Sequence, residues 1–224
     1  MGLVKSQYNA LKTLYDVTRG VDWIWDESSD AGPIWNFTDD SDPCDPIWQG
    51  LTCNKLKTQV TALFLDNYGL NGSLPSSVDW YSSLSTSLNS LELYNNFLQG
   101  QIPQSIGNLT LLTYLRLDNN QLTGPLPDSL GNLRLLIELA LEENQLSGHL
   151  PDSLSNLKSL EFLFLYTNQL SGPIPSSYGS SFRNMTSFEL YENRLTGTIP
   201  SSLGEMTAMR IFTLHTNNLK GPLP

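Results

Sequence analysis

Apolar and polar residues alternate in short blocks along most of the chain, and the blocks have the form L-x-L-x-x-N. Their asparagines lie at steps of 24, 24, 24, 25 and 24 residues, at Asn96, Asn120, Asn144, Asn168, Asn193 and Asn217. One earlier block has Tyr68 at this position and precedes a 28-residue step with an insertion around "DWYSSLSTS". A period of this size is typical of stacked repeats, so the pattern predicts seven copies of one unit over residues 60–224.

Each copy predicts a strand, a corner and a turn. Leucines two residues apart, such as Leu115 and Leu117, point to one face of a strand, and their neighbours point to the other face. The asparagine amide can bond to backbone groups of the adjacent coil, so stacked copies are expected to form a ladder. A second short extended piece and an irregular helical turn are expected next, because a proline in every copy disfavours a long helix.

The whole unit, L-x-x-L-x-L-x-x-N-x-L-x-G-x-I/L-P-x-x-L-x-x-L, resembles the plant-type leucine-rich repeat of receptor-kinase ectodomains and polygalacturonase-inhibiting proteins. The resemblance implies an α/β repeat fold. This fold is a right-handed, curved leucine-rich-repeat solenoid with a parallel β-sheet on its concave side, short helical or 3-10 turns on its convex side and a helical N-terminal cap. Residues 1–59 are then the cap, and residues 60–224 are seven repeats of which the last is truncated.

The segment "DPCDPIWQGLTC" resembles the N-terminal cap of this family, and the resemblance implies a disulfide between Cys44 and Cys53. The cysteine spacing and the long segment before it are closer to caps of algal and protist proteins. An amphipathic helix is predicted between Ser6, as its N-cap, and Gly20 by the spacing of Tyr8, Leu11, Leu14 and Val17. This helix is expected to cover the first coil together with Trp23, Trp25, Trp35 and Trp48.

The opposite end, "LKGPLP", stops in the middle of a repeat. No later coil covers Leu214, Leu219 and Leu223, so we expect either a longer protein or an assembly contact with a partner at this uncapped repeat.

A disulfide requires an oxidising compartment, and four N-x-S/T sequons favour the same location: Asn36, Asn71, Asn108 and Asn184. The sequence has no signal peptide and no 18-residue apolar run, so we expect no direct membrane insertion by this segment. We predict an extracellular, cell-surface or secretory-lumen location. The N-terminal "MGLVKS" supports a competing interpretation, because it fits the N-myristoylation pattern with Gly2 as acceptor and implies a cytosolic protein.

Outward positions of the strands are expected to carry function, because they can vary without disturbing the core. Aromatic residues gather there, and eight acids accompany a single base, Arg116. The predicted partner-binding residues are Tyr94, Tyr114, Arg116, Glu138, Glu142, Phe162, Phe164, Tyr166, Glu189, Tyr191 and Glu192. Exposed aromatic clusters indicate a covered surface.

The predicted partner is therefore a protein or peptide with basic residues. Nucleic acid and acidic polysaccharide are disfavoured, because the chain has a net charge of −10 and would repel them. Alternatives are a neutral glycan stacked on Phe164, Tyr166 and Tyr191, or a structural role in a surface or cell-wall assembly. Ice binding is disfavoured, because the polar columns that include Asn71 and Thr123 are too mixed to form a matched array.

An enzyme is disfavoured, and the sequence predicts no cofactor and no metal site. The two histidines, His149 and His215, are expected on different faces of the solenoid, and no serine elbow or phosphate loop occurs. Glu142 and Glu143 are adjacent, so they do not form a glycosidase pair. The stretch "DDSDPCD" at residues 39–45 lacks the glycine and distal glutamate of an EF-hand loop and is interpreted as a solvated loop rather than a calcium site.

Overall fold

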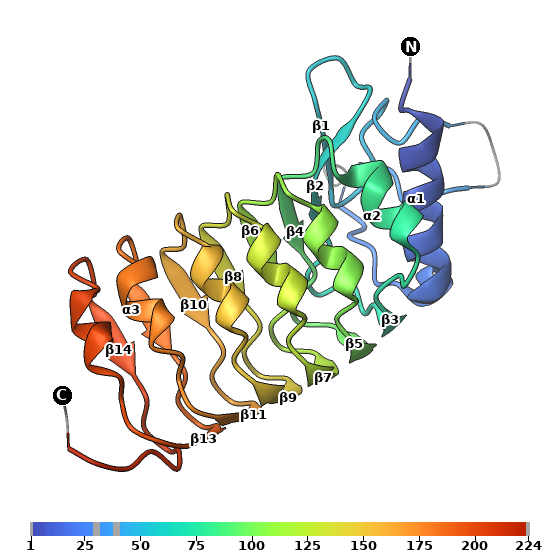
Figure 1. Cartoon of the computed structure of the whole chain (residues 1–224). Helices are drawn as coiled ribbons and strands as arrows, with labels where there is room; N and C mark the ends of the chain where they lie inside the picture. The colour runs from blue at the N-terminus through green and yellow to red at the C-terminus, as the bar shows by residue number, and fades with distance from the viewer. Residues whose placement is uncertain (1, 29–31, 38–40, 223–224) are drawn as a thin grey trace.

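The computed structural model describes residues 2–28, 32–37 and 41–222 as an elongated stack of coils (Figure 1). Within these residues, a long sheet has the strand order β1-β2-β4-β6-β8-β10-β12-β14. Its strands are β1 (Leu51–Cys53), β2 (Val60–Phe64), β4 (Ser90–Glu92), β6 (Tyr114–Arg116), β8 (Glu138–Ala140), β10 (Phe162–Phe164), β12 (Ser187–Glu189) and β14 (Ile211–Thr213). All pairs from β2 onward are parallel, while β1 runs antiparallel to β2.

Equivalent repeat positions lie side by side in this sheet. Leu139 of β8 aligns with Leu163 of β10, and Glu138 aligns with Phe162. The inward leucines are fully buried in one continuous core, as the two-residue period predicts. We call the solvent-facing side of this sheet, together with the outward-pointing residues among the three that follow each strand, the concave face.

A second parallel sheet follows the corners of the coils, with the order β13-β11-β9-β7-β5-β3. Its strands are β3 (Asn71–Ser73), β5 (Phe97–Gln101), β7 (Gln121–Pro125), β9 (Gln145–His149), β11 (Gln169–Gly172) and β13 (Arg194–Leu195). Helical turns close the coils on a further side, in a row that Figure 1 shows in front: α2 (Val78–Leu84), η2 (Gln104–Asn108), η3 (Asp128–Asn132), η4 (Asp152–Asn156), α3 (Ser177–Ser181) and η5 (Ser201–Glu205). The leucine-rich-repeat solenoid with short outer turns is confirmed, and the insertion in the first repeat forms α2.

The repeated asparagines form the expected ladder between the coils. Asn144 Oδ1 accepts a hydrogen bond from Leu122 N at 2.8 Å, and its Nδ2 donates to Leu117 O at 3.0 Å, both in the preceding coil. The same Nδ2 also donates to two carbonyls of its own corner. The remaining ladder asparagines repeat this pattern, so buried backbone groups at each corner are satisfied.

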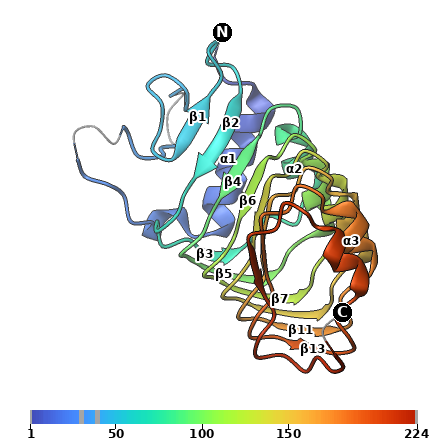
Figure 2. The ribbon, with the colours of Figure 1, turned by 90° about the vertical axis from the view of Figure 1, so that its left-hand side faces the viewer.

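The N-terminal helix α1 (Lys5–Val17) packs beside α2 at the start of the stack (Figure 2). The predicted cap at Ser6 is wrong: the N-cap is Val4, which makes no side-chain cap bond, and the helix ends at Val17, with Thr18 as its C-cap rather than Gly20. Val17 is exposed, whereas Gln7 is buried. The Gln7 side chain accepts a hydrogen bond from Val60 N of β2 and donates one to Ser83 O of α2, so it holds α1 against the start of the stack.

Aromatic side chains fill the space between α1 and the first coil, and the short helix η1 (Gly20–Asp22) leads into them. Three of the four predicted tryptophans are buried, and Trp25 is half-buried against Tyr68. The Cys44–Cys53 disulfide is present, with a Cα–Cα distance of 6.0 Å. The cap therefore rests on packing that occurs once in the chain, in contrast to the repeating leucine core.

The last described coil is less covered than the others. Ile211 and Phe212 of β14 are exposed, and Leu214 and Leu219 are only half-buried, as expected for leucines without a following coil. Leu223 lies outside the described residues, as do Thr38 of the first sequon and Asp39 and Asp40 of the acidic loop.

Candidate recognition face

Aromatic side chains of the concave face gather on its C-terminal half. Phe162 and Phe164 project from β10 with ring centroids 6.2 Å apart. Tyr166 stacks on Tyr191 at 4.4 Å, and Tyr191 stacks on His215 at 4.6 Å, both with ring planes 7° apart. We call Tyr166, Tyr191 and His215 the aromatic stack. Both faces of the Tyr191 ring are thus covered by neighbours.

The N-terminal half of the face is organised around Arg116. Its Nε lies 3.3 Å from Glu138 Oε1 and 3.7 Å from Asp118 Oδ1, and its Nη1 lies 3.8 Å from Glu92 Oε2. The guanidinium also lies over the Tyr94 ring at 4.3 Å. One cation is therefore shared by three carboxylates and one aromatic ring.

Two acids of the face are more buried than the sequence indicates. Asp118 is 4% exposed and Glu142 is 7% exposed, although both lie at outward positions two residues after the end of their strands. Burial raises the pKa of the Glu142 carboxyl to about 8, and the negative charge of Asp118 adds to this shift. Burial likewise raises the pKa of Asp118 and of Glu138, although Arg116 opposes both shifts. The face is therefore less negative at neutral pH than its count of acids implies.

The residue that follows Asp118 or Glu142, and its equivalent in each of the other repeats, has a left-handed backbone conformation. Asparagine holds it in the first three repeats, and asparagine tolerates this conformation well. The later repeats instead have Glu143, Thr167, Glu192 and Thr216 there, with φ of 52° to 53°. Four residues of the C-terminal half thus accept backbone strain and present a carboxylate or a hydroxyl at the face.

The structure brings most of the predicted residues into two neighbouring groups. Tyr94, Arg116 and Glu138 meet in one group, which we call the arginine cluster and which also includes Glu92 and Asp118. In the other group, Phe162 pairs with Phe164, and Tyr166 stacks on Tyr191. Glu189 and Glu192 make other contacts, to Ser187 Oγ and to Thr167 Oγ1. Tyr114 is exposed on β6. His215 and Asp118 were not among the predicted site residues, although their places in the same column as Tyr191 and Glu142 were a sufficient signal.

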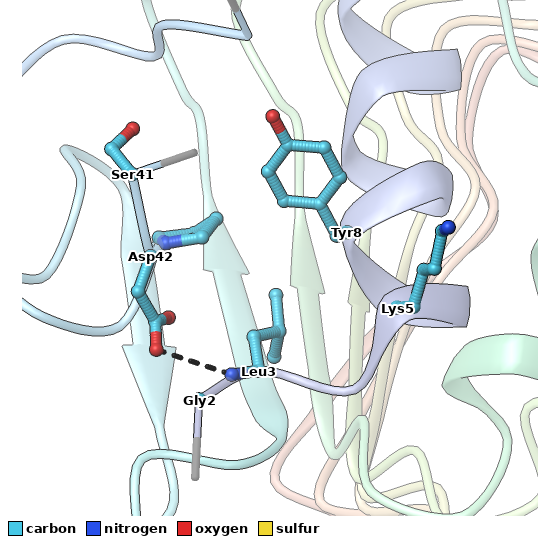
Figure 3. A pocket seen from close by; sticks show the side chains of 7 residues that line it. Gly2, Leu3, Lys5, Tyr8, Ser41 and Asp42 are labelled. Carbon is cyan, nitrogen blue, oxygen red and sulfur yellow. Dashed lines mark hydrogen bonds between the residues drawn. The ribbon is translucent and has the colours of Figure 1, made fainter. Parts of the chain in front are cut away.

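A separate cavity of about 390 Å³ lies in the cap (Figure 3). Its lining includes Leu3, Lys5, Tyr8 and Asp42, and Asp42 Oδ2 accepts a hydrogen bond from Leu3 N at 3.2 Å. None of these residues belongs to the concave face. The cavity has no counterpart in the sequence prediction.

The sequon asparagines lie away from the strands of the long sheet. Asn108 ends η2 and Asn184 follows α3, and both are exposed, whereas Asn36 and Asn71 are half-buried. Among the described residues, no group of three or more His, Cys, Asp or Glu side chains is placed to hold a metal ion. The described part of the chain also has no helix whose length and apolarity would allow it to cross a membrane.

The Leucine Rich Repeat family model matches residues 87–109, 111–133, 135–157 and 184–206. Together with the asparagine ladder and the parallel sheet, this match shows that the chain has the leucine-rich-repeat fold. Its coils are similar to those of plant receptor kinases.

Three solved structures define this similarity. The PEPR1–AtPEP1 structure is 32% identical with a TM-score of 0.81, covering 99% of this chain and 29% of that chain. A second structure is the ectodomain of the plant membrane receptor kinase GASSHO1/SCHENGEN3 from Arabidopsis thaliana in complex with CASPARIAN STRIP INTEGRITY FACTOR 2. It is 30% identical with a TM-score of 0.65, and the match covers 97% of this chain and 30% of that chain. Pollen Receptor Kinase 3 is 28% identical with a TM-score of 0.74, and the match covers 94% of this chain and 97% of that chain. The chain thus spans less than a third of the first two receptors.

Proposed function

We propose that this chain is a non-enzymatic recognition module that binds a protein or peptide with basic residues on its concave face. The observation that carries the proposal is the row of aromatic side chains beside an excess of carboxylates on the outward positions of one rigid sheet. Aromatic anchors supply affinity, and a surplus of negative charge steers a cationic partner.

A peptide fits this face better than a neutral glycan. Sugar rings bind aromatic residues through the flat faces of the rings, yet both faces of Tyr191 are covered by Tyr166 and His215. The central ring, Tyr191, therefore offers only its edge and hydroxyl, which suit hydrogen bonding to a polypeptide. Phe162 and Phe164 remain half-exposed beside it and can anchor an apolar side chain.

The related structures support the same class of function. The PEPR1 structure contains AtPEP1, and the GASSHO1/SCHENGEN3 ectodomain contains a bound factor. We infer that this chain, with the same kind of solenoid, also receives a partner. The Cys44–Cys53 disulfide and the exposed sequons Asn108 and Asn184 favour a place outside the cell or in the secretory lumen.

The test is a selection from a displayed random-peptide library, first with the wild-type chain and then with Phe164→Ala combined with Tyr166→Ala. The proposal predicts enriched peptides rich in arginine or lysine, and a loss of capture by the double variant. Enrichment of neutral or acidic peptides, or unchanged capture by the double variant, would contradict it.

Salt dependence separates recognition from a permanent assembly role. Steered, reversible binding of a basic peptide should lose association rate as ionic strength rises, because exposed charges are screened. A large apolar assembly contact should change little. Stopped-flow association at low and high salt distinguishes the two.

Intact-mass analysis of protein from its natural source tests the compartment. Glycan on Asn108 or Asn184 together with an oxidised Cys44–Cys53 pair is the expected result. Free thiols without glycan would contradict the extracellular or lumenal location.

A further inference from the structure

Glu142 lies on the concave face between the arginine cluster and the aromatic stack. Its side chain is more than nine-tenths buried, and its Oε2 has no hydrogen-bond partner in the described part of the chain. Its Oε1 has one weak side-chain contact, a hydrogen bond that the Tyr166 hydroxyl donates at 3.5 Å. A buried carboxyl with an unused oxygen is costly, so its position calls for a partner.

The described residues supply no cation for it. Arg116 is the only lysine or arginine at the outward positions of the seven repeats. Its ion pairs are with Glu92, Asp118 and Glu138, and none reaches Glu142. Asp118, at the equivalent position one coil earlier, also has an oxygen without a hydrogen-bond partner. The arginine is therefore shared among three acids through ion pairs, its own buried Nε has no hydrogen-bond partner in the described part of the chain, and Glu142 is not among the acids it contacts.

Arg116 itself indicates which cation this surface accepts. Its guanidinium lies over Tyr94 and contacts carboxylates of the neighbouring coils. Further along the face, Glu142 in the next coil and Tyr166 in the coil after it provide a carboxylate and a tyrosine again, but without a guanidinium. Because no described group of acids is placed to hold a metal ion, an organic cation is the partner that fits.

We propose that Glu142 binds an arginine side chain of the peptide ligand, whose guanidinium replaces the Tyr166 hydroxyl at Glu142 Oε1 and also donates to the unpartnered Oε2. This inference rests on the proposed function of the concave face and specifies the residue that selects the ligand. Tyr166 has to move its hydroxyl but keeps its ring in the aromatic stack.

Binding should release a proton. Burial, with smaller contributions from the charges of Asp118 and Glu138, raises the pKa of Glu142 to about 8, although its backbone hydrogen bond and Arg116 oppose the shift. The other ionisable groups that face it are Tyr166 and, beside the corner, Glu143. The free carboxyl is therefore mostly protonated, and pairing with a guanidinium sends its proton to solvent. Below pH 8, affinity should rise about tenfold per pH unit, because one proton is exchanged per ligand.

The probe is the pentapeptide Gly-Gly-Arg-Gly-Gly with acetylated and amidated ends, compared with the same peptide containing citrulline. Titrations followed by NMR of backbone amides, at about pH 6 and about pH 7, use millimolar peptide. The arginine peptide should shift concave-face signals saturably and about tenfold more tightly at the higher pH. The citrulline peptide should produce no saturable shift, because it has the shape of arginine without its charge.

Three variants assign the effect to Glu142. Glu142→Gln should weaken binding of the arginine peptide and remove its pH dependence. Tyr166→Phe should strengthen binding and keep the pH dependence, because it removes the competing hydroxyl and preserves the ring. Glu205→Gln, an exposed acid in η5, removes the same charge far from the face and should behave as wild type.

Equal shifts with both peptides, no saturable binding of the arginine peptide, or unchanged pH-dependent binding by Glu142→Gln would overturn the assignment. The library selection separates these outcomes from failure of the proposed function. If selected basic peptides still bind the concave face, only the role of Glu142 is wrong. If the library yields no concave-face ligand at all, the proposed function itself fails.

Discussion

The inner and outer faces of the same strands differ in how much their residues vary from one repeat to the next. On the inner face, equivalent positions such as Leu139 and Leu163 have the same residue and are fully buried. On the outer face, the aligned pair is Glu138 and Phe162. Each coil must fit the next one through the inner face, whereas the outer face touches only solvent or a partner. The fold and its recognition chemistry can therefore change independently.

This separation predicts that inner and outer substitutions have different signatures. Inner changes should lower the free energy of unfolding, and outer changes should affect binding with little loss of stability. The predictions below test that contrast, beginning with the largest expected effect.

Asn144→Ala should destabilise the chain by about 3 kcal/mol, because it leaves the buried Leu122 N without its partner. The carbonyls of Leu117, Leu141 and Glu142 each lose one of two hydrogen bonds. Chemical denaturation measures the change. Asn217→Ala is the matched control in the last coil, where Asn217 is only half-buried. It should cost about 1 kcal/mol, because water can replace the amide. Equal losses at both positions would contradict the ladder as the source of the effect.

Gly131→Ala should cost about 3 kcal/mol, because a Cβ at this position in η3 would overlap the backbone oxygen of Ser153 in the next turn. Gly204 occupies the equivalent position in η5, and a Cβ there meets no atom within 4 Å. Gly204→Ala should therefore leave the melting temperature unchanged or slightly raised. Similar melting temperatures for the two variants would show that the turns do not pack as tightly as described.

Phe164→Ala combined with Tyr166→Ala should weaken binding of a library-selected peptide by about 2 kcal/mol, or about 30-fold. The control is Phe97→Ala, which removes an aromatic ring that is 54% exposed in β5, outside the concave face. Its affinity, measured by calorimetry, should equal that of the wild type. Weakening by Phe97→Ala alone would move the binding surface to the second sheet.

Glu142→Gln should stabilise the chain increasingly as pH rises. The folded pKa of Glu142 is about 8, above its ordinary value of 4.5, so the folded state holds a proton that the unfolded state releases. Wild-type stability should therefore fall between about pH 4.5 and pH 8, by at most about 1 kcal/mol per pH unit, and the variant should lose this slope. Denaturation midpoints across this range measure it. Parallel curves for wild type and variant would contradict the burial of Glu142.

Glu143→Asn should stabilise the chain by about 0.5 kcal/mol, because asparagine adopts a left-handed backbone more readily than glutamate. The same substitution should weaken a basic ligand if the strained carboxylate serves recognition. Stability and affinity measured on one preparation test both effects. A stabilised variant with unchanged affinity would show that this strain has no role in binding.

The periodic features were predictable from the sequence because each is written many times. Leucine spacing, the asparagine corner and the proline-limited turns follow from elementary strand and turn geometry, and all appear in the structure. Features that occur only once in the chain were harder to predict from the sequence. Gln7 does not look like a core residue, because its burial depends on contacts with Val60 and Ser83, far away in the sequence.

Within the candidate face, the repeat pattern predicted which residues occupy equivalent outward positions, but it did not predict how much of each side chain is exposed to solvent. Glu142 and Asp118 occupy outward positions, yet neighbouring side chains cover them, and coverage by side chains from adjacent coils is not encoded in the repeat pattern. The stacking of Tyr166, Tyr191 and His215 likewise depends on the spacing between coils, which sets ring centroids 4.4 and 4.6 Å apart.

The most direct test of the division between the two faces is a scan of single substitutions on a displayed chain, scored for display level and for capture of a library-selected peptide. Inner leucines and ladder asparagines should lower both scores, and residues such as Phe164 and Tyr166 should lower capture alone. The account would be contradicted if substitutions on the concave face left capture unchanged, and the substitutions that lower capture alone lay on the second sheet or in the outer turns.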